Sequence, residues 1–304
     1  MTRRALVTGA HGFVGRHLVA HLWAAGDEVV ELDRVAGTDI VDRDAVVAAT
    51  VAAAPDVVYH LAGWSDVGGS WTAASDALVA NAVGTLHVLD AARIGGAQRV
   101  LVVSSADVYG SVEPGRLPIT EDHPLRPVSP YAASKVAADF LALQAWLGHG
   151  QEVVRVRAFN HLGPGQSEHF VVPALAARIA RNEIDGRDDV PVGNLGTRRD
   201  YTDVRDVVRA YRVLMATGEP GAVYNVCSGR DVGIDDIAGR LLAMATRSMH
   251  LVDDPSRWRP VDVPVLRGDP SRLEQATGWR PEIALDQSLA DVLADWRART
   301  AATA

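Results

Sequence analysis

The stretch Ala5-Leu6-Val7-Thr8-Gly9-Ala10-His11-Gly12-Phe13-Val14-Gly15 decides the fold that we expect for this chain. Its first four residues are a short, mostly apolar run that indicates a buried strand. Three glycines spaced by three follow, and Arg16 to Ala25 then has the pattern of a helix. A strand, a glycine turn and a helix in this order are the context that a dinucleotide-binding motif requires. The stretch therefore predicts a dinucleotide-binding turn.

Each glycine of the turn has a separate task in such a motif. Gly9 makes the tight turn, Gly12 lets the backbone approach a pyrophosphate, and Gly15 lets the helix pack closely on the strand. The N–H groups at the start of the helix, near Phe13 and Val14, are expected to donate hydrogen bonds to phosphate oxygens. The alternative is a glycine-rich turn without a ligand, which the flanking strand and helix disfavour.

A second predicted strand, Glu28 to Leu32, ends at Asp33 and Arg34, eighteen residues after Gly15. An acidic residue at about this distance from the turn hydrogen-bonds the ribose hydroxyls of the cofactor. Asp33 would repel the 2′-phosphate of NADP, whereas Arg34 beside it could bind that phosphate. We therefore expect NAD as the cofactor, with NADP as the alternative. Asp33 could otherwise be a solvated acid at a strand end.

The run from Asp56 to Gly63 predicts a buried parallel strand, because it is apolar over most of its length. Its end consists of small residues, which lets the cofactor pass close to Leu61 and Ala62. His60 lies near that end and could suggest a catalytic base. A hydrogen-bonded core histidine is the favoured interpretation of His60.

A further predicted strand, residues 99–103, leads to Ser105 and Asp107 beyond its carboxyl end, where parallel sheets place ligand chemistry. Tyr131 follows Ser105 by twenty-six residues, and Lys135 stands four residues after Tyr131. Residues four apart share one face of a helix. An ammonium beside a phenol favours the phenolate and lowers the phenol pKa from about 10. The pair therefore has the composition of a general acid–base site, although such spacing also occurs by chance.

In this order and spacing, the glycine turn, Ser105 and Tyr131-x-x-x-Lys135 resemble the extended short-chain dehydrogenases/reductases that act on nucleotide sugars. The resemblance implies that Ser105 hydrogen-bonds the reacting sugar oxygen and that Tyr131 exchanges its proton. It implies that Lys135 holds the nicotinamide ribose and lowers the Tyr131 pKa. It also implies an adenine contact near Asp39 and Ile40.

The resemblance covers nearly the whole chain and implies an α/β fold, a doubly wound parallel sheet (Rossmann) with a smaller, interleaved C-terminal substrate domain. Residues 1–165, with returning segments near 200–230, would form the dinucleotide-binding domain. Residues 166–304 would form most of the substrate-binding domain. Apolar runs and helical periodicity also predict strands at 153–159 and 222–226, and helices at 72–93, 204–216, 234–245 and 285–296, with another ending near 183.

Two arginines match places where nucleotide-sugar enzymes bind the substrate diphosphate. Arg199 lies in Arg199-Asp200-Tyr201, and Arg259 lies in Arg259-Pro260-Val261-Asp262. Two guanidinium groups that converge on a diphosphate would supply positive charge to an otherwise acidic chain. For either arginine alone, a surface salt bridge is the alternative. Asn160, in a loop rich in Gly and Pro, is expected at the rim of the substrate site.

The substrate half resembles the branch that handles GDP-linked 6-deoxyhexoses, with GDP-4-keto-6-deoxy-D-mannose reductases and GDP-mannose 4,6-dehydratases sharing most of its motifs. We expect reduction of the 4-keto group of a GDP-4-keto-6-deoxyhexose, with 4,6-dehydration or 4-epimerisation as alternatives. Dehydration needs a further acid–base group, and the residues after Ser105 are Ala106 and the short acid Asp107. The chain departs from the family pattern at Asp107, where glutamate is common, and at Trp64-Ser65-Asp66.

Composition excludes other classes of function. The net charge of −8 and the lack of a basic cluster disfavour nucleic acid as a partner. We expect no membrane span, no signal peptide and a cytoplasmic location, because no long apolar run is present. The lone Cys227 allows no internal disulfide, and no spacing of ligands predicts a metal site.

A homodimer is expected as well. The predicted helix 72–93 and the helix that carries Tyr131 hold more apolar residues than one sheet face needs, and twofold dimers are the commonest assembly. A catalytically silent NAD-binding regulator is the rival from another class of protein. Such regulators typically lose the Tyr or the Lys, and both are kept in this sequence.

Overall fold

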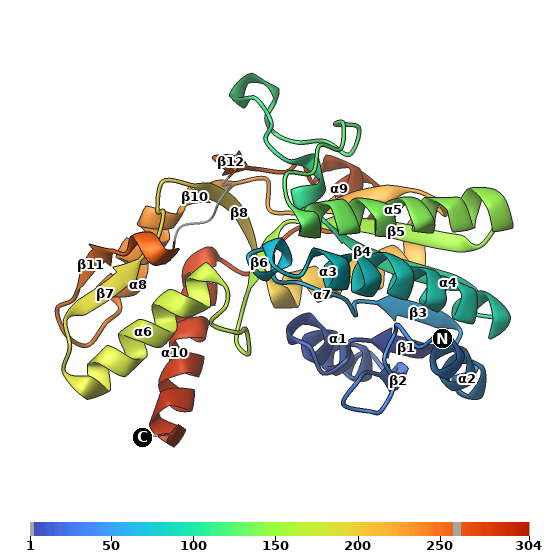
Figure 1. Ribbon diagram of the computed structural model, residues 1–304, viewed down its shortest axis with the longest axis horizontal. Coiled ribbons are helices and arrows are strands. Elements are labelled where there is room, and N and C mark those ends of the chain that lie inside the picture. Colours follow the sequence, from blue (N-terminus) through green and yellow to red (C-terminus); the bar gives the residue numbers. More distant parts are fainter. Residues whose placement is uncertain (1–2, 258–262, 304) are drawn as a thin grey trace.

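A six-stranded parallel sheet is the centre of the computed structural model, which describes residues 3–257 and 263–303 (Figure 1). The strand order is β2-β1-β3-β4-β5-β9, so the direction of winding reverses between β1 and β3. In such sheets the ligand crevice lies at the carboxyl ends next to this reversal. The predicted doubly wound α/β fold is confirmed. The strands are β1 (Arg4–Thr8), β2 (Glu28–Leu32), β3 (Val57–His60), β4 (Arg99–Ser105), β5 (Glu152–Ala158) and β9 (Val223–Val226).

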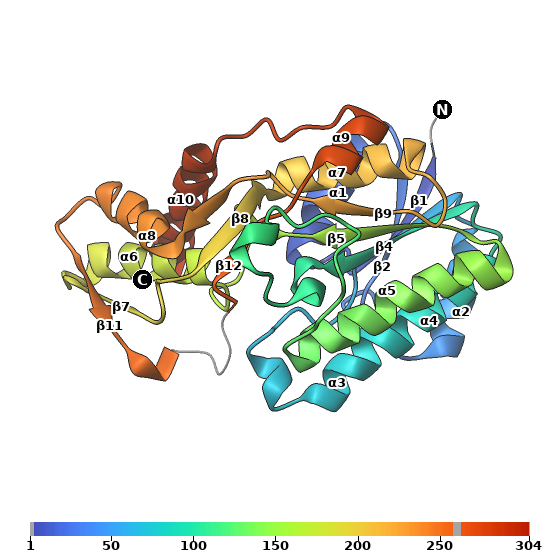
Figure 2. The same cartoon turned by 90° about the horizontal axis from the view of Figure 1, so that it is seen from above.

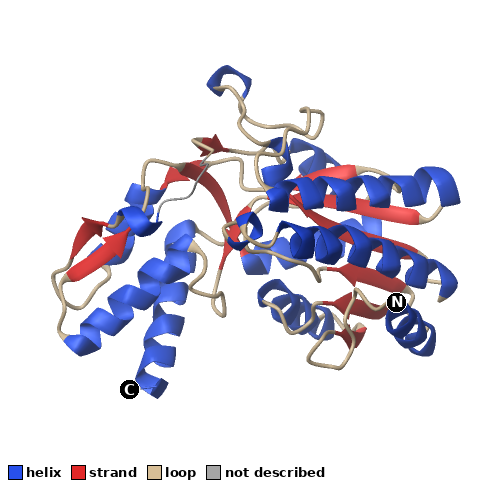
Figure 3. Ribbon diagram, viewed as in Figure 1, coloured by secondary structure: helices blue, strands red, loops and turns tan. Residues whose placement is uncertain are grey.

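Helices cover both faces of this sheet, which is why β3 is buried over its whole length and β4 over most of its length (Figures 2 and 3). One face packs against α1 (Phe13–Ala24), α7 (Val204–Thr217) and α9 (Ser271–Thr277). The other face packs against α2 (Arg43–Ala53), α4 (Gly84–Ile94) and α5 (Pro130–His149). The two apolar cores on these faces hold the carboxyl ends of the strands in one row.

A smaller layer lies beyond the carboxyl edge of the large sheet (Figure 1). Its central strand β8 (Arg198–Asp203) pairs with β10 (Asp231–Gly233), β12 (Val265–Leu266) and β6 (Asn160–Leu162). A separate pair, β7 (Asp189–Val192) and β11 (His250–Asp253), packs with α6 (Val171–Asp185), α8 (Ile234–Ala243) and α10 (Leu285–Thr303) around another apolar core. β9 returns to the large sheet between β8 and β10, so the segments interleave. The predicted domain limits stay a prediction.

Some elements differ from those predicted. α1 begins at Phe13 rather than Arg16, because Gly12 takes the N-cap position and no capping side chain marks the start. β4 continues to Ser105, and α10 continues to Thr303. The predicted helix 72–93 is interrupted, since α3 (Ala74–Leu78) and α4 are joined by a π-helical turn, Val79–Val83. Periodicity alone does not reveal such a turn.

The segment Ala74–Ile94 is long and apolar enough, by composition, to cross a membrane. Half of its apolar window is buried inside the protein, against α2 and α5. A core helix passes the same test, and the apolar core formed with the large sheet accounts for its composition.

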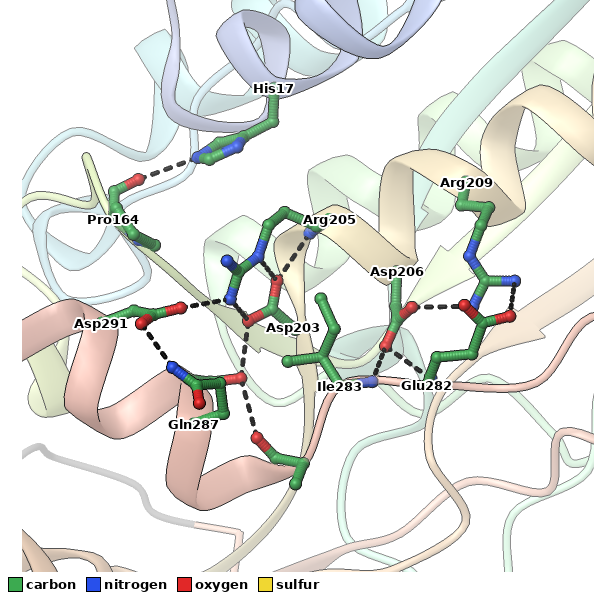
Figure 4. A network of polar contacts seen from close by, with 12 residues as sticks. His17, Pro164, Asp203, Arg205, Asp206, Arg209, Glu282, Ile283, Gln287 and Asp291 are labelled. Atoms are coloured by element: carbon green, nitrogen blue, oxygen red, sulfur yellow. Dashed lines mark hydrogen bonds and ion pairs between the residues drawn. The ribbon is translucent and has the colours of Figure 1, made fainter.

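Polar contacts fasten the small layer to the helix α7 on the large sheet (Figure 4). Asp203 caps α7 by accepting the Arg205 N–H at 2.8 Å, and it also accepts the hydroxyl of Ser288 in α10 at 2.6 Å. Arg205 reaches Asp291 of α10 at 2.6 Å. The buried carboxylate of Asp206 accepts the backbone N–H groups of residues 282 and 283 at 2.8 and 2.9 Å. These bonds join segments far apart in the sequence.

Asp139 on α5 is a buried carboxylate that two arginines of β5 neutralise. Its side chain is 0% exposed, and it accepts Arg155 Nη1 at 2.6 Å and Arg157 Nε at 2.9 Å. Arg157 Nη1 also donates to the Tyr109 hydroxyl at 3.0 Å. A buried pair is strongly destabilising to break, because the remaining charge stays buried without a partner.

We predict that Asp139→Ala lowers the free energy of unfolding by about 3–5 kcal/mol, because two guanidinium groups would lose their counter-charge. Asp236→Ala is the matched control, since Asp236 forms an exposed pair with Arg240 at 2.7 Å. That variant should lose much less stability than Asp139→Ala, because solvent screens the exposed pair. Urea unfolding of both variants and the wild type measures the difference. Equal losses in the two variants would contradict the role given to Asp139.

The predicted homodimer face carries exposed apolar side chains on adjacent helices. Val79, Val83 and Leu86 are exposed on the segment Ala74–Ile94, and Phe140 and Leu147 are exposed on α5. Contiguous apolar surface of this kind marks interaction sites.

We predict a homodimer through this face, with Phe140→Glu giving a monomer because a charge would be buried at the contact. Light scattering at micromolar concentration should report twice 32.4 kDa for the wild type and 32.4 kDa for the variant. Ile184→Glu, at an exposed position on α6, is the control that should stay dimeric. A monomeric wild type would refute the prediction.

Candidate active site

A single cavity of about 1490 Å³ lies between the carboxyl edge of the large sheet and the small layer. It brings together all the predicted site residues that the structure describes, although they come from segments far apart in the sequence. Arg259 lies outside the described residues. The predicted residues that line the cavity are Gly9, Gly12, Phe13, Val14, Gly15, Asp33, Arg34, Asp39, Ile40, Leu61, Ala62, Ser105, Asp107, Tyr131, Lys135, Asn160 and Arg199.

The glycine turn forms a cradle that side chains would fill. Gly9 has φ +70°, a conformation that favours glycine, and a Cβ there would lie 2.8 Å from the Ala62 nitrogen. A Cβ on Gly15 would lie 2.0 Å from the Gly9 oxygen, so α1 could not pack this closely on β1. Gly12 supplies no side-chain cap, and the first turn of a helix leaves its N–H groups without intrahelical acceptors. The cradle fits a pyrophosphate.

Asp33 directly follows the end of β2, at the same edge of the sheet. Its carboxylate accepts the backbone N–H groups of His11 at 3.3 Å and Val35 at 3.0 Å, which fix its orientation beside the glycine turn. Arg34 is exposed at the mouth of the cavity. Asp39 and Ile40 line the same end, with Ile40 largely buried. This end of the cavity has the groups that a ribose and an adenine need.

Ser105 and Tyr131 meet in the middle of the cavity. Ser105 is the last residue of β4, and Tyr131 is the second residue of α5, whose N-cap Ser129 accepts the Ala132 N–H at 3.1 Å. The side chains of Ser105 and Tyr131 are hydrogen-bonded to each other, and both are largely buried. Two hydroxyls at this position could contact one substrate oxygen.

The pKa shift of Tyr131 is opposite to the one expected. Burial raises the pKa of the phenol well above its ordinary value, and the charge of Asp107 raises that pKa further, whereas the bond to Ser105 lowers it. Lys135 Nζ donates to the Val103 carbonyl at 3.0 Å, and burial lowers the pKa of Lys135 to about 8. The expected lowering of the Tyr131 pKa by Lys135 is wrong, because burial is the largest effect on this pKa and raises it. Tyr131 is a protonated phenol at neutral pH.

Asp107 lies near Ser105 and lines the same cavity as Tyr131. It belongs to the 3-10 turn Ala106–Tyr109 after β4, and its N–H donates to Ser105 Oγ at 3.2 Å. Its charge acts on Tyr131, and it lines the cavity. Ala106 is 1% exposed. Asp107 is therefore the acid nearest to Tyr131 for which proton chemistry can be argued.

Asn81 is a residue that the sequence analysis missed. It lies buried in the π-helical turn, and its side chain accepts the Trp64 N–H at 2.8 Å and donates to Ser134 Oγ at 2.8 Å. It thus joins the loop after β3 to the helix of Tyr131 and Lys135. The sequence did carry a signal for Asn81, namely an amide side chain within a mostly apolar helical run. His60 bonds Thr8 and Thr85 in the core, which confirms the structural interpretation.

The substrate half of the cavity is lined with arginines. Arg199 on β8 lines it and donates to the backbone carbonyls of Arg198 and Val263 at 2.9 and 2.7 Å. Arg178 and Arg257 also line it and were not predicted. Asn160 is the first residue of β6, so in the sequence it follows the end of β5 and precedes these arginines. The local positive charge suits an anionic ligand.

Comparison with known proteins gives consistent likenesses over almost the whole chain. A family model described as GDP-mannose 4,6 dehydratase matches residues 34–292. GDP-6-deoxy-D-mannose reductase of Pseudomonas aeruginosa is 40% identical, covering 98% of this chain and 99% of that protein. The structure of RMD from the same species complexed with NADPH has a TM-score of 0.91 at 40% identity, covering 98% of this chain and 100% of that chain. Thermus thermophilus UDP-glucose 4-epimerase in complex with NAD has a TM-score of 0.88 at 29% identity, covering 97% and 99%.

Proposed function

The chain belongs to the extended short-chain dehydrogenases/reductases of the NAD-dependent epimerase/dehydratase family, and we propose that it reduces the 4-keto group of a GDP-4-keto-6-deoxyhexose. It is an NAD(P)-dependent enzyme that acts on nucleotide sugars. The relative named GDP-6-deoxy-D-mannose reductase supports the GDP-linked substrate.

The state of Tyr131 is the observation that carries the proposal. A ketone that receives hydride must also receive a proton, so its donor must be protonated at working pH. The raised pKa of Tyr131 keeps the phenol protonated, and the hydrogen bond from Ser105 fixes where it points. Oxidation of a sugar hydroxyl needs the phenolate instead. The buried phenol can therefore serve as the proton donor that the reduction requires.

A reduced nicotinamide dinucleotide, when bound, supplies the hydride. The glycine turn and the start of α1 would hold its pyrophosphate, Asp33 would accept its ribose hydroxyls, and Lys135 would contact the second ribose. Ser105 would donate to the 4-keto oxygen and orient it toward Tyr131. The Tyr131 hydroxyl would then transfer its proton to that oxygen, which leaves an alcohol.

A 4,6-dehydratase is the second candidate, and Asp107 is the observation that favours it. Dehydration must remove a proton and expel a hydroxyl, which requires an acid–base group beside Tyr131. Asp107 lines the cavity and acts electrostatically on Tyr131. Its side chain is one methylene shorter than that of glutamate, and its neighbour Ala106 has no ionisable group, so reduction remains the favoured reaction. An epimerase would use the same Ser105 and Tyr131.

We predict that the wild type consumes reduced cofactor in proportion to GDP-4-keto-6-deoxymannose, and that Tyr131→Phe slows turnover by about 10²–10⁴-fold because the proton donor is lost. Cofactor affinity should stay nearly unchanged. Absorbance of the nicotinamide and chromatography of the sugar product measure both quantities. Tyr59→Phe, at a buried position of β3 outside the cavity, is the matched control.

The same assay separates the two candidate reactions. GDP-mannose with oxidised cofactor and no reductant should remain unchanged. Accumulation of a 4-keto-6-deoxy product would show a dehydratase, and normal turnover by Tyr131→Phe would remove Tyr131 from the mechanism.

We predict that NAD(H) binds more tightly than NADP(H), because the carboxylate of Asp33 repels a 2′-phosphate. Asp33→Ala should narrow or reverse this preference, whereas Arg34→Ala should weaken only NADP(H). Calorimetric titration of the three proteins measures the constants. The structure of the Pseudomonas aeruginosa relative contains NADPH, so NADP(H) is the alternative that the test must exclude. A wild type that binds NADP(H) more tightly than NAD(H) would overturn the prediction.

A further inference from the structure

Arg178 is an unusual residue of helix α6. The run Val172–Ala180 reads VPALAARIA, and Arg178 is its only polar side chain. Its neighbours in this run are buried, whereas Arg178 is half-buried and lines the cavity. Burying part of a guanidinium costs free energy unless acceptors surround it. The position therefore calls for acceptor groups in the cavity.

The described protein leaves most of the donor groups of Arg178 unused. Arg178 Nη1 donates to the Pro191 carbonyl of β7 at 2.8 Å, which fixes the plane of the guanidinium. The two carboxylates whose charges act on Arg178 are engaged elsewhere, because Glu168 pairs with Arg181 and Asp254 pairs with Arg257, each at 2.8 Å. Among residues 3–257 and 263–303, Arg178 forms no ion pair.

Burial and nearby charges also act on the guanidinium of Arg178. Burial lowers the pKa of Arg178, and the charge of Arg257 lowers it further. The charges of Glu168 and Asp254 raise this pKa, but they do not outweigh burial and the charge of Arg257. A ligand that brings hydrogen-bond acceptors to the guanidinium would offset these two effects.

Strand register orders the groups along the cavity. Ser105 pairs with Ala158 at the end of β5, and Asn160 of β6, two residues further, pairs with Tyr201 of β8. Arg199 lies two residues before Tyr201, and the loop 193–197 connects β8 back to β7, where Arg178 is anchored. The order is therefore the reacting centre, then Arg199, then Arg178. In Figure 1, α6 and β7 lie at the far side of the small layer from the large sheet.

A nucleotide sugar has its own fixed order of sugar, diphosphate, ribose and base. With the sugar at Ser105 and Tyr131, the diphosphate falls near Arg199, and the base falls at the outer end near Arg178. We propose that Arg178 recognises the guanine base of the substrate by donating two hydrogen bonds to its O6 and N7 atoms. This inference rests on the proposed GDP-linked substrate.

The chemistry of the outer end fits a base better than a phosphate. Leu175 of α6, Val192 of β7 and the half-buried Leu195 line the same cavity, so part of its wall is apolar. An arginine fork matches the paired acceptors O6 and N7 of guanine, and this pairing is the commonest specific contact of arginine with a base. Adenine carries a donor in place of O6, so the same fork rejects it.

The test measures binding of GDP, IDP and ADP by calorimetry, without turnover. IDP shares O6 and N7 with GDP, whereas ADP has an amino group in place of O6. The variants are Arg178→Met, which removes the donors, and Arg178→Lys, which keeps the charge but not the fork. Arg181→Met is the matched control, because Arg181 lies one turn further on α6, is exposed, and does not line the cavity. Thermal unfolding of each variant verifies that it is folded.

The wild type should bind GDP and IDP at least about tenfold more tightly than ADP. Both Arg178 variants should lose about 5- to 150-fold in GDP and IDP affinity, with ADP changed by less than about threefold. Arg181→Met should leave all three unchanged. Equal losses for all three nucleotides would mean that Arg178 binds phosphate, and equal binding of GDP and ADP by the wild type would likewise overturn the inference. Recovery of GDP affinity in Arg178→Lys would also overturn it, because charge alone would then suffice.

These outcomes are separate from those of the proposed reaction. Selective GDP binding that depends on Arg178, together with no reductase activity, would remove only the reaction. Reductase activity with no effect of Arg178 on nucleotide selectivity would remove only the inference.

Discussion

The buried Asp139 carboxylate is the contact on which the geometry of the site depends. It joins α5, which carries Tyr131 and Lys135, to Arg155 and Arg157 of β5 through bonds of 2.6 and 2.9 Å. Arg157 extends the network to the Tyr109 hydroxyl, in the turn that follows Ser105. A buried network of paired charges resists displacement, because moving one group leaves a buried charge without its partner. The donor helix and the strand ends are thus held as one unit.

The cavity needs both layers of the molecule. The large sheet supplies the glycine turn, Asp33 and Ser105, all at the carboxyl ends of strands on either side of the winding reversal. The small layer supplies the arginines that face an anionic substrate. The contacts of Asp203 and Asp206 with the segment that leads into α10 hold these layers together. A ligand that spans the junction can therefore contact the reacting centre at one end and the arginines of the small layer at the other.

Burial sets the chemistry of the reacting centre more strongly than charge does. Tyr131 and Lys135 stand near one another on α5, yet the pKa of the phenol rises and that of the ammonium falls. Both shifts have desolvation as their largest cause, since it disfavours the ionised form of each group. A protonated phenol beside Ser105 suits the delivery of a proton to a ketone.

The sequence by itself determined the parts of this protein that depend on local backbone geometry. The glycine spacing from Gly9 to Gly15 predicted the turn, because a Cβ at these places meets backbone atoms. Ser105, Tyr131 and Lys135 were found because their spacing and their place after strands form a motif. Apolar runs predicted the six strands of the large sheet to within one to three residues at most ends.

Only the tertiary structure decided which residues are buried together. Arg178 has no motif around it, and its significance lies in a charge balance with Arg181, Arg257 and their carboxylate partners from distant segments. Asn81 matters because a π-helical turn directs it at Trp64 and Ser134. The direction of the Tyr131 pKa shift depends on how many atoms exclude water from the phenol. Desolvation and long-range electrostatics are properties of the packed protein, so no local pattern of residues encodes them.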